Sequence, residues 1–268
     1  LVNGKTAPDS FNTQLDETAY PLLMADQLHL TDHDLYERHI KPAANFVAAH
    51  GPSFGVERWE EQDGYSPSTI AAEIAGLVSA ADLADANNDP ASAAIWRGTA
   101  DEFQRSIKAW TVTTTGPFAP RYFIRLSKIG DPNAAISYNV GNGGPTLDQR
   151  QVIDQGFLEL TRLGELSQND PDIVASLGVV DAKIRSTTSA GDGFHRYNGD
   201  GYGDRSSDGR PWAPSGQGDG HLWPALSAER AEQQLQAGDS TGAAAFLNGM
   251  ARMGSGVGLI PEQNWENP

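Results

Sequence analysis

Two adjacent glutamates follow a tryptophan in a segment bounded by glycines, at Trp59, Glu60 and Glu61. Neighbouring like charges raise the pKa of one partner, and an apolar ring beside them penalises ionisation further. A carboxylic acid kept protonated in this way can act as a general acid near neutral pH. The tryptophan adds a flat apolar face on which a sugar ring can stack. A solvated acidic loop is the alternative explanation of this segment.

A further carboxyl group lies near the end of the chain, where Glu262 follows a proline and precedes Trp265. Glycoside hydrolysis needs two carboxyl groups, one protonated and one ionised. For an inverting mechanism, we expect the carboxyls of Glu60 and Glu262 to face each other across one pocket at ~6.5–9.5 Å. Two unrelated surface acids are the alternative, because the chain holds 35 acidic residues.

Arg196 lies among aromatic, asparagine and aspartate residues and could donate hydrogen bonds to sugar hydroxyls. A solvated cluster of glycine and aspartate turns would give the same composition. The aspartates at 200, 204 and 208 do not match the helix–loop–helix calcium pattern, and the six histidines show no close pairing. We therefore expect no metal site. Asp16, at the start of a predicted helix, could face the same pocket or serve as an ordinary capping residue.

The composition narrows the class of ligand. The chain has 19 basic and 35 acidic residues, a net charge of −16 and no cysteine. Nucleic acids and anionic membranes would be repelled, and disulfides, thiolate catalysis and cysteine-bound zinc are excluded. No run approaches the ~20 apolar residues of a membrane span. We expect a secreted protein. The first residues are not a signal peptide, so any export signal has been removed or lies outside this chain.

The helical periodicity predicts eight helices. They cover residues 16–30, 32–50, 66–87, 89–110, 148–168, 170–188, 224–237 and 240–252. Several begin with aspartate or with proline in the first turn, as N-termini often do.

The links between these helices alternate between short and long. The long ones, at 50–65, 113–147, 189–223 and 253–268, hold most of the glycine, proline, tryptophan and tyrosine. Helices joined by short links pack antiparallel, so all the long links emerge at one end, where function is expected. They differ in length and share no motif, which argues against a solenoid of helical repeats. The pattern favours a toroid of helical hairpins, an α/α barrel.

Four motifs, at residues 14–20, 57–66, 196–202 and 260–263, together resemble those of family 15 glycoside hydrolases, the glucoamylase-like inverting enzymes. The bacterial glucodextranases within that family are the nearest in pattern. The resemblance implies an (α/α)6 toroid, with Glu60 as general acid and Glu262 as general base. The resemblance also implies a tryptophan at a substrate subsite, for which Trp223 is the first choice and Trp212 the second. The residues that the resemblance and the motifs assign to substrate binding are Trp59, Glu61, Arg196, Tyr197, Trp223 and Asp16.

The resemblance also implies an activity and an incomplete ring. It implies release of glucose from the non-reducing end of an α-glucan, with α-1,6-linked dextran as first choice and α-1,4-linked starch as second, and with no cofactor. A ring of this kind usually has six hairpins, the sequence predicts four, and the Arg–Asp pair of the family that grips the non-reducing glucose has no counterpart. We therefore expect residues 1–268 to be the central part of the catalytic domain, with the remainder of that domain as its partner. A non-catalytic carbohydrate-binding helical scaffold is the alternative.

Overall fold

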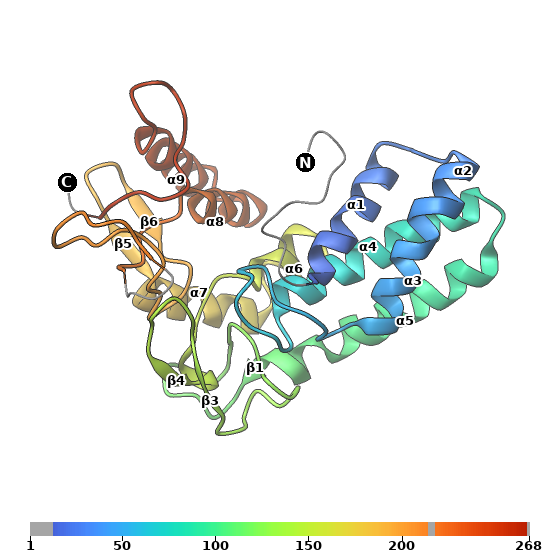
Figure 1. The fold of residues 1–268 in the computed structure, drawn as a ribbon, viewed down its shortest axis with the longest axis horizontal. Helices are drawn as coiled ribbons and strands as arrows, with labels where there is room; N and C mark the ends of the chain where they lie inside the picture. Colours follow the sequence, from blue (N-terminus) through green and yellow to red (C-terminus); the bar gives the residue numbers. More distant parts are fainter. Residues whose placement is uncertain (1–12, 214–217, 267–268) are drawn as a thin grey trace.

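The computed structural model describes residues 13–213 and 218–266 (Figure 1). Helices of three to 22 residues alternate with irregular connections. The helices are α1 (Leu15–Gln27), α2 (His33–Leu35), α3 (Lys41–His50), α4 (Pro67–Ala86), α5 (Pro90–Thr111), α6 (Leu158–Arg162), α7 (Pro171–Lys183), α8 (Pro224–Gln236) and α9 (Ser240–Arg252). A π-helical turn, η1 (Tyr36–Ile40), leads into α3, and a 3-10 turn, η2 (Gln149–Gln151), precedes α6.

The helix starts follow from capping chemistry. Asp89 and Asp170 accept hydrogen bonds from backbone N–H groups in the first turns of α5 and α7, and a proline occupies the first position of each helix. Asp239 caps α9 in the same way. At the start of α1, however, Gln14 is the capping residue and makes no side-chain cap. Asp16 is therefore not the N-cap residue: one of its carboxylate oxygens accepts from the Glu17 N–H in the first turn, and the other accepts from the Thr69 hydroxyl.

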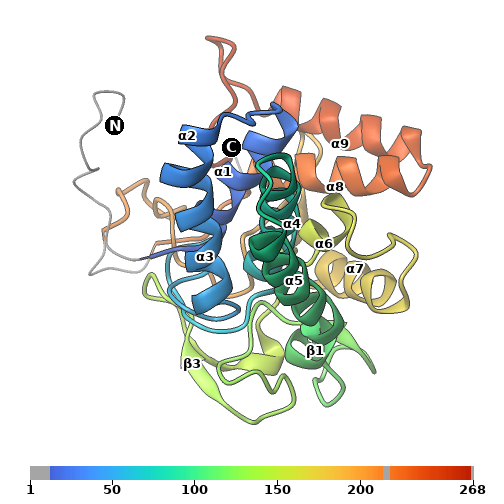
Figure 2. The same ribbon diagram turned by 90° about the vertical axis from the view of Figure 1, so that its right-hand side faces the viewer.

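Helix α4 is the centre of the packing. It is buried on nearly all sides and packs against α1, α5 and α6, while α6 packs against α8 and α8 against α9 (Figures 1 and 2). Helices α1 and α4 approach closely at Gly76, where a Cβ atom would lie 2.7 Å from the carbonyl oxygen of Ala19. The absence of a side chain at Gly76 thus sets the spacing of these two helices.

The long connections carry three two-stranded antiparallel ribbons. The strand pairs are β1 (Val112–Thr113) with β2 (Tyr122–Phe123), β3 (Ser137–Asn139) with β4 (Thr146–Asp148), and β5 (Arg185–Thr187) with β6 (Asp192–Phe194). Isolated bridges join Tyr65 to Ser127 and Asp154 to Tyr197. The long connections therefore meet, as the alternation of links predicts.

The predicted helix over 148–168 is wrong for most of its length. Asp148 ends β4 and caps η2, and the helix itself is limited to α6. The intervening backbone has partners elsewhere: the Val152 carbonyl accepts from Arg125 and the Ile153 N–H donates to Asn198. These tertiary hydrogen bonds hold the segment extended. The predicted helix over 170–188 also ends early, at Lys183, where β5 begins shortly after.

A large core fills the space between the helices, and a smaller cluster lies beneath the long connections. The smaller cluster consists of Leu126, Tyr138, Val140, Val152 and Tyr197, with Trp59 and Leu147 packed against it. It supports the loops that carry the predicted site. Among the described residues, no helix combines the length and the apolar character needed to cross a bilayer.

Candidate active site

The segment that carries Glu60 is a small closed loop. Val56 pairs with Asp63, and the N–H of Glu57 donates to the carbonyl of Gln62 at 2.9 Å. At the tip, the N–H of Glu60 donates to the Glu57 carbonyl at 2.7 Å, and Glu60 has a φ of 63°. Non-glycine residues rarely adopt this left-handed conformation and often do so at functional sites. The Glu60 side chain is exposed at the tip of the loop.

Arg125 anchors this loop from below. Its guanidinium is completely buried and lies 2.7 Å from the Glu57 carboxylate and 2.9 Å from that of Glu61. It also donates to the Val140 carbonyl at 3.2 Å and lies 3.8 Å from the ring centre of Tyr197. Buried charges are stable only when they are paired and hydrogen-bonded. Arg125 thereby ties the connections before α4, before α6 and before α8 together.

Glu61 is held by groups from several connections. Its carboxylate accepts hydrogen bonds from the Tyr197 hydroxyl at 2.5 Å and from the Asn142 amide, and Arg196 lies 2.8 Å away. Burial raises the pKa of Glu61, whereas the charges of Arg125 and Arg196 oppose that increase. Two guanidinium partners and a hydroxyl donor favour the ionised form of Glu61.

Arg196 lies in an aromatic enclosure. Its guanidinium carbon is 4.7 Å from the ring centre of Tyr202 and 5.3 Å from those of Trp59 and Trp223. Asp200 fixes the orientation through two hydrogen bonds, at 2.7 and 2.6 Å. Burial opposes the charge of Arg196, but Asp200 and Glu61 together raise its pKa. The result is a fixed, fully charged donor among aromatic rings.

Glu262 is brought to the same region by the tail of the chain. Asn264 pairs with Leu222, which places Glu262 on the wall of a cavity of about 370 Å³ together with Tyr202, Trp212 and Trp265. Burial, the charge of Glu262 and, to a smaller extent, the charge of Glu60 raise the pKa of Tyr202. Tyr202 therefore lies within electrostatic range of both predicted catalytic carboxylates, although they are about 200 residues apart in the sequence.

The tail is fastened by His221. This ring is buried, stacks on Trp265 with ring centres 4.9 Å apart, and has Glu266 at 3.2 Å. The other carboxylate oxygen of Glu266 is 3.5 Å from His195. These contacts fix the backbone on both sides of the bridge between Asn264 and Leu222, close to Glu262.

Comparison with known proteins gives the family. The model of glycosyl hydrolases family 15 matches residues 6–253. This chain belongs to glycosyl hydrolase family 15. A glucoamylase from Clostridium sp. (strain G0005) is 42% identical over 255 residues, which are 95% of this chain and 35% of that protein. The chain thus spans about a third of the length of this relative.

Solved structures agree with the assignment to family 15. The crystal structure of a bacterial glucoamylase complexed with acarbose superposes with a TM-score of 0.90 at 42% identity, covering 95% of this chain and 37% of that one. A wild-type glycosidase at 20% identity superposes with a TM-score of 0.65, covering 93% of this chain and 56% of that one, and shows the fold alone. The predicted (α/α)6 barrel class is therefore confirmed, as is the predicted family.

The remaining predicted residues occupy different surroundings in this family 15 chain. Trp59 is half-buried, donates to Asp154 at 3.2 Å and contacts Trp223 edge to face. Tyr197 is completely buried beneath Glu61, and Asp16 is buried against Thr69. Trp212 contacts Tyr202, with ring centres 4.9 Å apart. Direct contact of these side chains with substrate stays a prediction.

Several residues that build the site were not predicted. Arg125 and Asp154 lie outside the predicted motifs, whereas Glu57 and Asp200 lie within them but had no predicted role; all four hold the predicted residues in place. A charged residue inside an apolar run, as at Arg125 between Ile124 and Leu126, is the one signal the sequence offered. Of the aspartates considered for calcium, Asp200 pairs with Arg196, Asp204 accepts from the Trp212 N–H and Asp208 pairs with Arg210. No cluster of metal-binding side chains is found in residues 13–213 and 218–266.

Proposed function

We propose that the protein carrying this chain is an inverting glycoside hydrolase that releases glucose from the non-reducing end of an α-glucan. The observation that carries this proposal is that Tyr202 lines one cavity with Glu262 and packs on Arg196, which lies 2.8 Å from Glu61, the neighbour of Glu60. The 42% identity to a glucoamylase over nearly the whole chain supports it.

In this proposal, Glu60 donates its proton to the glycosidic oxygen as the bond from that oxygen to the anomeric carbon breaks. Glu262 accepts a proton from a water molecule, whose oxygen attacks the anomeric carbon from the opposite face. The configuration is therefore inverted, and β-glucose is the first product. Glu61 accepts and Arg196 donates hydrogen bonds to sugar hydroxyls, while Trp59 and Trp223 offer apolar faces. The protein residues supply all of this chemistry, without a cofactor.

The linkage preference divides into two proposals. The motif resemblance to glucodextranases favours α-1,6-linked dextran. The relatives at 42% identity carry the name glucoamylase and favour α-1,4-linked glucan. We give α-1,4 the first test because those matches cover 95% of this chain, and α-1,6 the second.

The test uses the intact protein with maltooligosaccharides and isomaltooligosaccharides, followed by proton NMR during the first minutes. We expect a β-anomeric glucose signal before mutarotation, and loss of this signal in Glu262→Gln. Initial release of α-glucose would contradict inversion. Binding of oligosaccharides without any hydrolysis would instead favour a non-catalytic carbohydrate-binding scaffold.

A further inference from the structure

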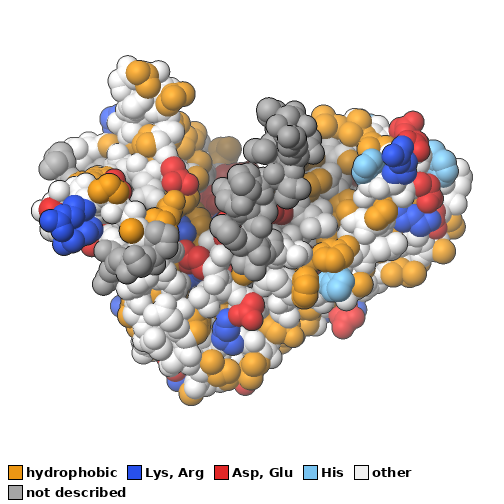
Figure 3. Space-filling model, viewed as in Figure 1, with side chains coloured by type: hydrophobic (Ala, Val, Ile, Leu, Met, Phe, Trp, Pro, Cys, Tyr) orange, Lys and Arg blue, Asp and Glu red, His pale blue; other side chains and the backbone are white. Residues whose placement is uncertain are grey.

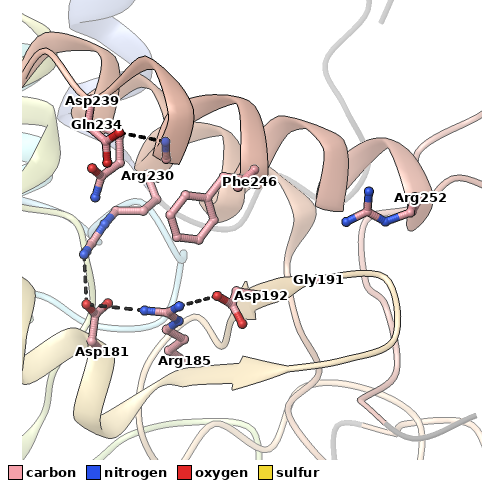
Figure 4. Close-up of a pocket in the computed structure, with 11 residues that line it drawn as sticks. Asp181, Arg185, Gly191, Asp192, Arg230, Gln234, Asp239, Phe246 and Arg252 are labelled. Atoms are coloured by element: carbon pink, nitrogen blue, oxygen red, sulfur yellow. Dashed lines mark hydrogen bonds and ion pairs between the residues drawn. The ribbon is translucent and has the colours of Figure 1, made fainter.

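A second cavity lies apart from Glu60 and Glu262, between α7, the β5–β6 hairpin, α8 and α9. Its volume is about 390 Å³, within the range of ~300–1,000 Å³ found for ligand sites. Asp181 comes from α7, Arg185 from β5, Arg230 from α8 and Phe246 from α9 (Figure 4). None of the residues that line this cavity belongs to the candidate active site.

Arg230 is the buried charged residue of this cavity. Its side chain is 5% exposed, and one of its terminal nitrogens donates to Asp181 at 3.0 Å. Its Nε and Nη1 atoms and the Oδ1 atom of Asp181 have no hydrogen-bond partner within the described residues. Leaving buried donors and acceptors unpaired is costly. A water molecule, or a ligand that carries hydroxyl groups, would satisfy these donors and this acceptor.

The charges on the lining balance. Arg185 pairs with Asp192 and lies 3.6 Å from Asp181, so positive and negative groups alternate along the cavity wall (Figure 4). The lining holds three arginines and three aspartates in all. A balanced set of this kind has little preference for an anion. It offers neighbouring donors and acceptors, which match the neighbouring hydroxyls of a sugar.

The cavity also has an apolar surface and a defined end. Phe246 is half-buried, and its ring is directed into the space between Arg230 and the hairpin (Figure 4). An aromatic face beside hydrogen-bonding groups suits the C–H face of a pyranose. At the hairpin turn, a Cβ atom on Gly191 would lie 3.0 Å from the Cα atom of Gly249, so the turn rests directly on α9. The hairpin is thereby held in place as one wall.

We propose that this cavity is an accessory carbohydrate-binding site. It holds a neutral segment of an oligosaccharide while the end of that oligosaccharide lies outside the cavity. The polyhydroxyl class of the ligand follows from the lining. That the sugar is an α-glucan rests on the proposed function. A weak site of this kind, with a Kd on the order of 1 mM, would retain a polymer and matter little for a short substrate.

The test measures binding of maltoheptaose to the intact protein by ligand-observed NMR, with the catalytic site saturated by acarbose. We expect residual saturable binding that Arg185→Ala weakens about tenfold. Phe246→Ala is the second variant and should weaken it too. Arg97→Ala is the matched control, because Arg97 is a similarly exposed arginine on α5 that pairs with Asp82 and Asp85. Thermal unfolding of each variant shows whether it is folded.

Measurements of hydrolysis rates provide a second test of the proposal. Arg185→Ala should change kcat/KM on maltotriose less than twofold and lower the rate on dilute soluble starch several-fold, whereas Arg97→Ala changes neither. Three outcomes would overturn the proposal: no binding in the presence of acarbose, equal binding by the folded variants and the control, or displacement of the oligosaccharide by millimolar phosphate. If the intact protein hydrolyses nothing, the proposed function fails, yet the comparison of Arg185→Ala with Arg97→Ala still decides whether the cavity binds sugar.

Discussion

Arg125 is a completely buried charge that pairs with two carboxylates of the candidate site. Its replacement by methionine leaves the buried carboxylates of Glu57 and Glu61 without their shared partner. Breaking a buried pair from one side costs ~3–5 kcal/mol. We expect urea unfolding of the intact Arg125→Met protein to show a loss of that size. Arg97→Ala, which breaks exposed pairs, should cost ~0–1 kcal/mol, and equal losses in the two variants would contradict the role of Arg125.

The proposed roles of Glu60 and Glu262 can be distinguished by comparing substrates with different leaving groups. Glu60→Gln should lower kcat by ~10²–10⁴-fold on maltooligosaccharides with little change in KM, because the proton matters when the leaving oxygen gains charge. The loss should be much smaller on α-glucosyl fluoride, which departs without protonation. Glu262→Gln should lose activity on both substrates, since each needs an activated water.

The two rate ratios can be compared directly in one series of initial-rate measurements. If Glu60→Gln loses as much on the fluoride as on the oligosaccharide, Glu60 has a structural role. Its exposed position at a tip with a φ of 63° argues that it is not part of the packing.

At the scale of elements, the turn that follows α6 holds a glutamate whose carboxyl group is buried. Both carboxyl oxygens of Glu165 are buried without a hydrogen-bond partner in the described part of the chain, and burial, followed by the charge of Glu159, raises the pKa of Glu165 to about 9. The folded state therefore binds a proton that the unfolded state releases at its ordinary pKa of 4.5. The stability that this proton contributes is full below that value and falls as the pH rises to about 9.

Glu165→Gln keeps the shape of the side chain and removes the ionisation. We expect the urea midpoint of the wild type to fall between pH 5 and pH 9 and that of Glu165→Gln to fall less. Glu73, completely buried in α4 with a pKa raised well above its ordinary value by burial, adds a similar slope in both proteins. Equal slopes in the two proteins would show that Glu165 finds a charged partner.

The sequence predicts the elements well where local signals agree with the packing. Helices α4, α5, α8 and α9 combine clear periodicity with a proline or an aspartate at the start, and their bounds lie close to those predicted. The segment 148–157 has helical periodicity as well, but its backbone bonds to Arg125 and Asn198. Those partners lie far away in the sequence, so no local pattern could reveal them. The same limit explains why the motif residues were found and Arg125 was not.

At the scale of the whole molecule, one face carries exposed apolar side chains. A cavity of about 380 Å³ on α1, α2 and α3 is lined almost entirely by apolar side chains, and Met24, Leu28 and Leu30 are exposed there. Hydrophobic side chains gather over this side in Figure 3. We propose that the remainder of a longer catalytic domain covers this face, since the glucoamylase relatives are almost three times as long as the matched region.

Expressed alone, residues 1–268 should bind a dye for apolar surface, tend to aggregate and release no glucose, because each Å² of exposed apolar surface costs ~25 cal/mol. The intact protein is the control and should bind little dye. A monodisperse product of these 268 residues that melts cooperatively and is active would show that this segment closes the site by itself.

The pairing of Arg125 also bears on folding during synthesis, because the ribosome makes the paired residues of the site in sequence order. Glu57 emerges first, and Arg125 follows 68 residues later. At ~5–20 residues per second, the nascent loop holds its acids unpaired for several seconds, and Glu262 arrives on the order of ten seconds or more after Glu57. Folding of the loop during synthesis is therefore unfavourable until translation passes Arg125. Synonymous codons that slow translation just before Arg125 should prolong this vulnerable interval and increase degradation of the nascent chain.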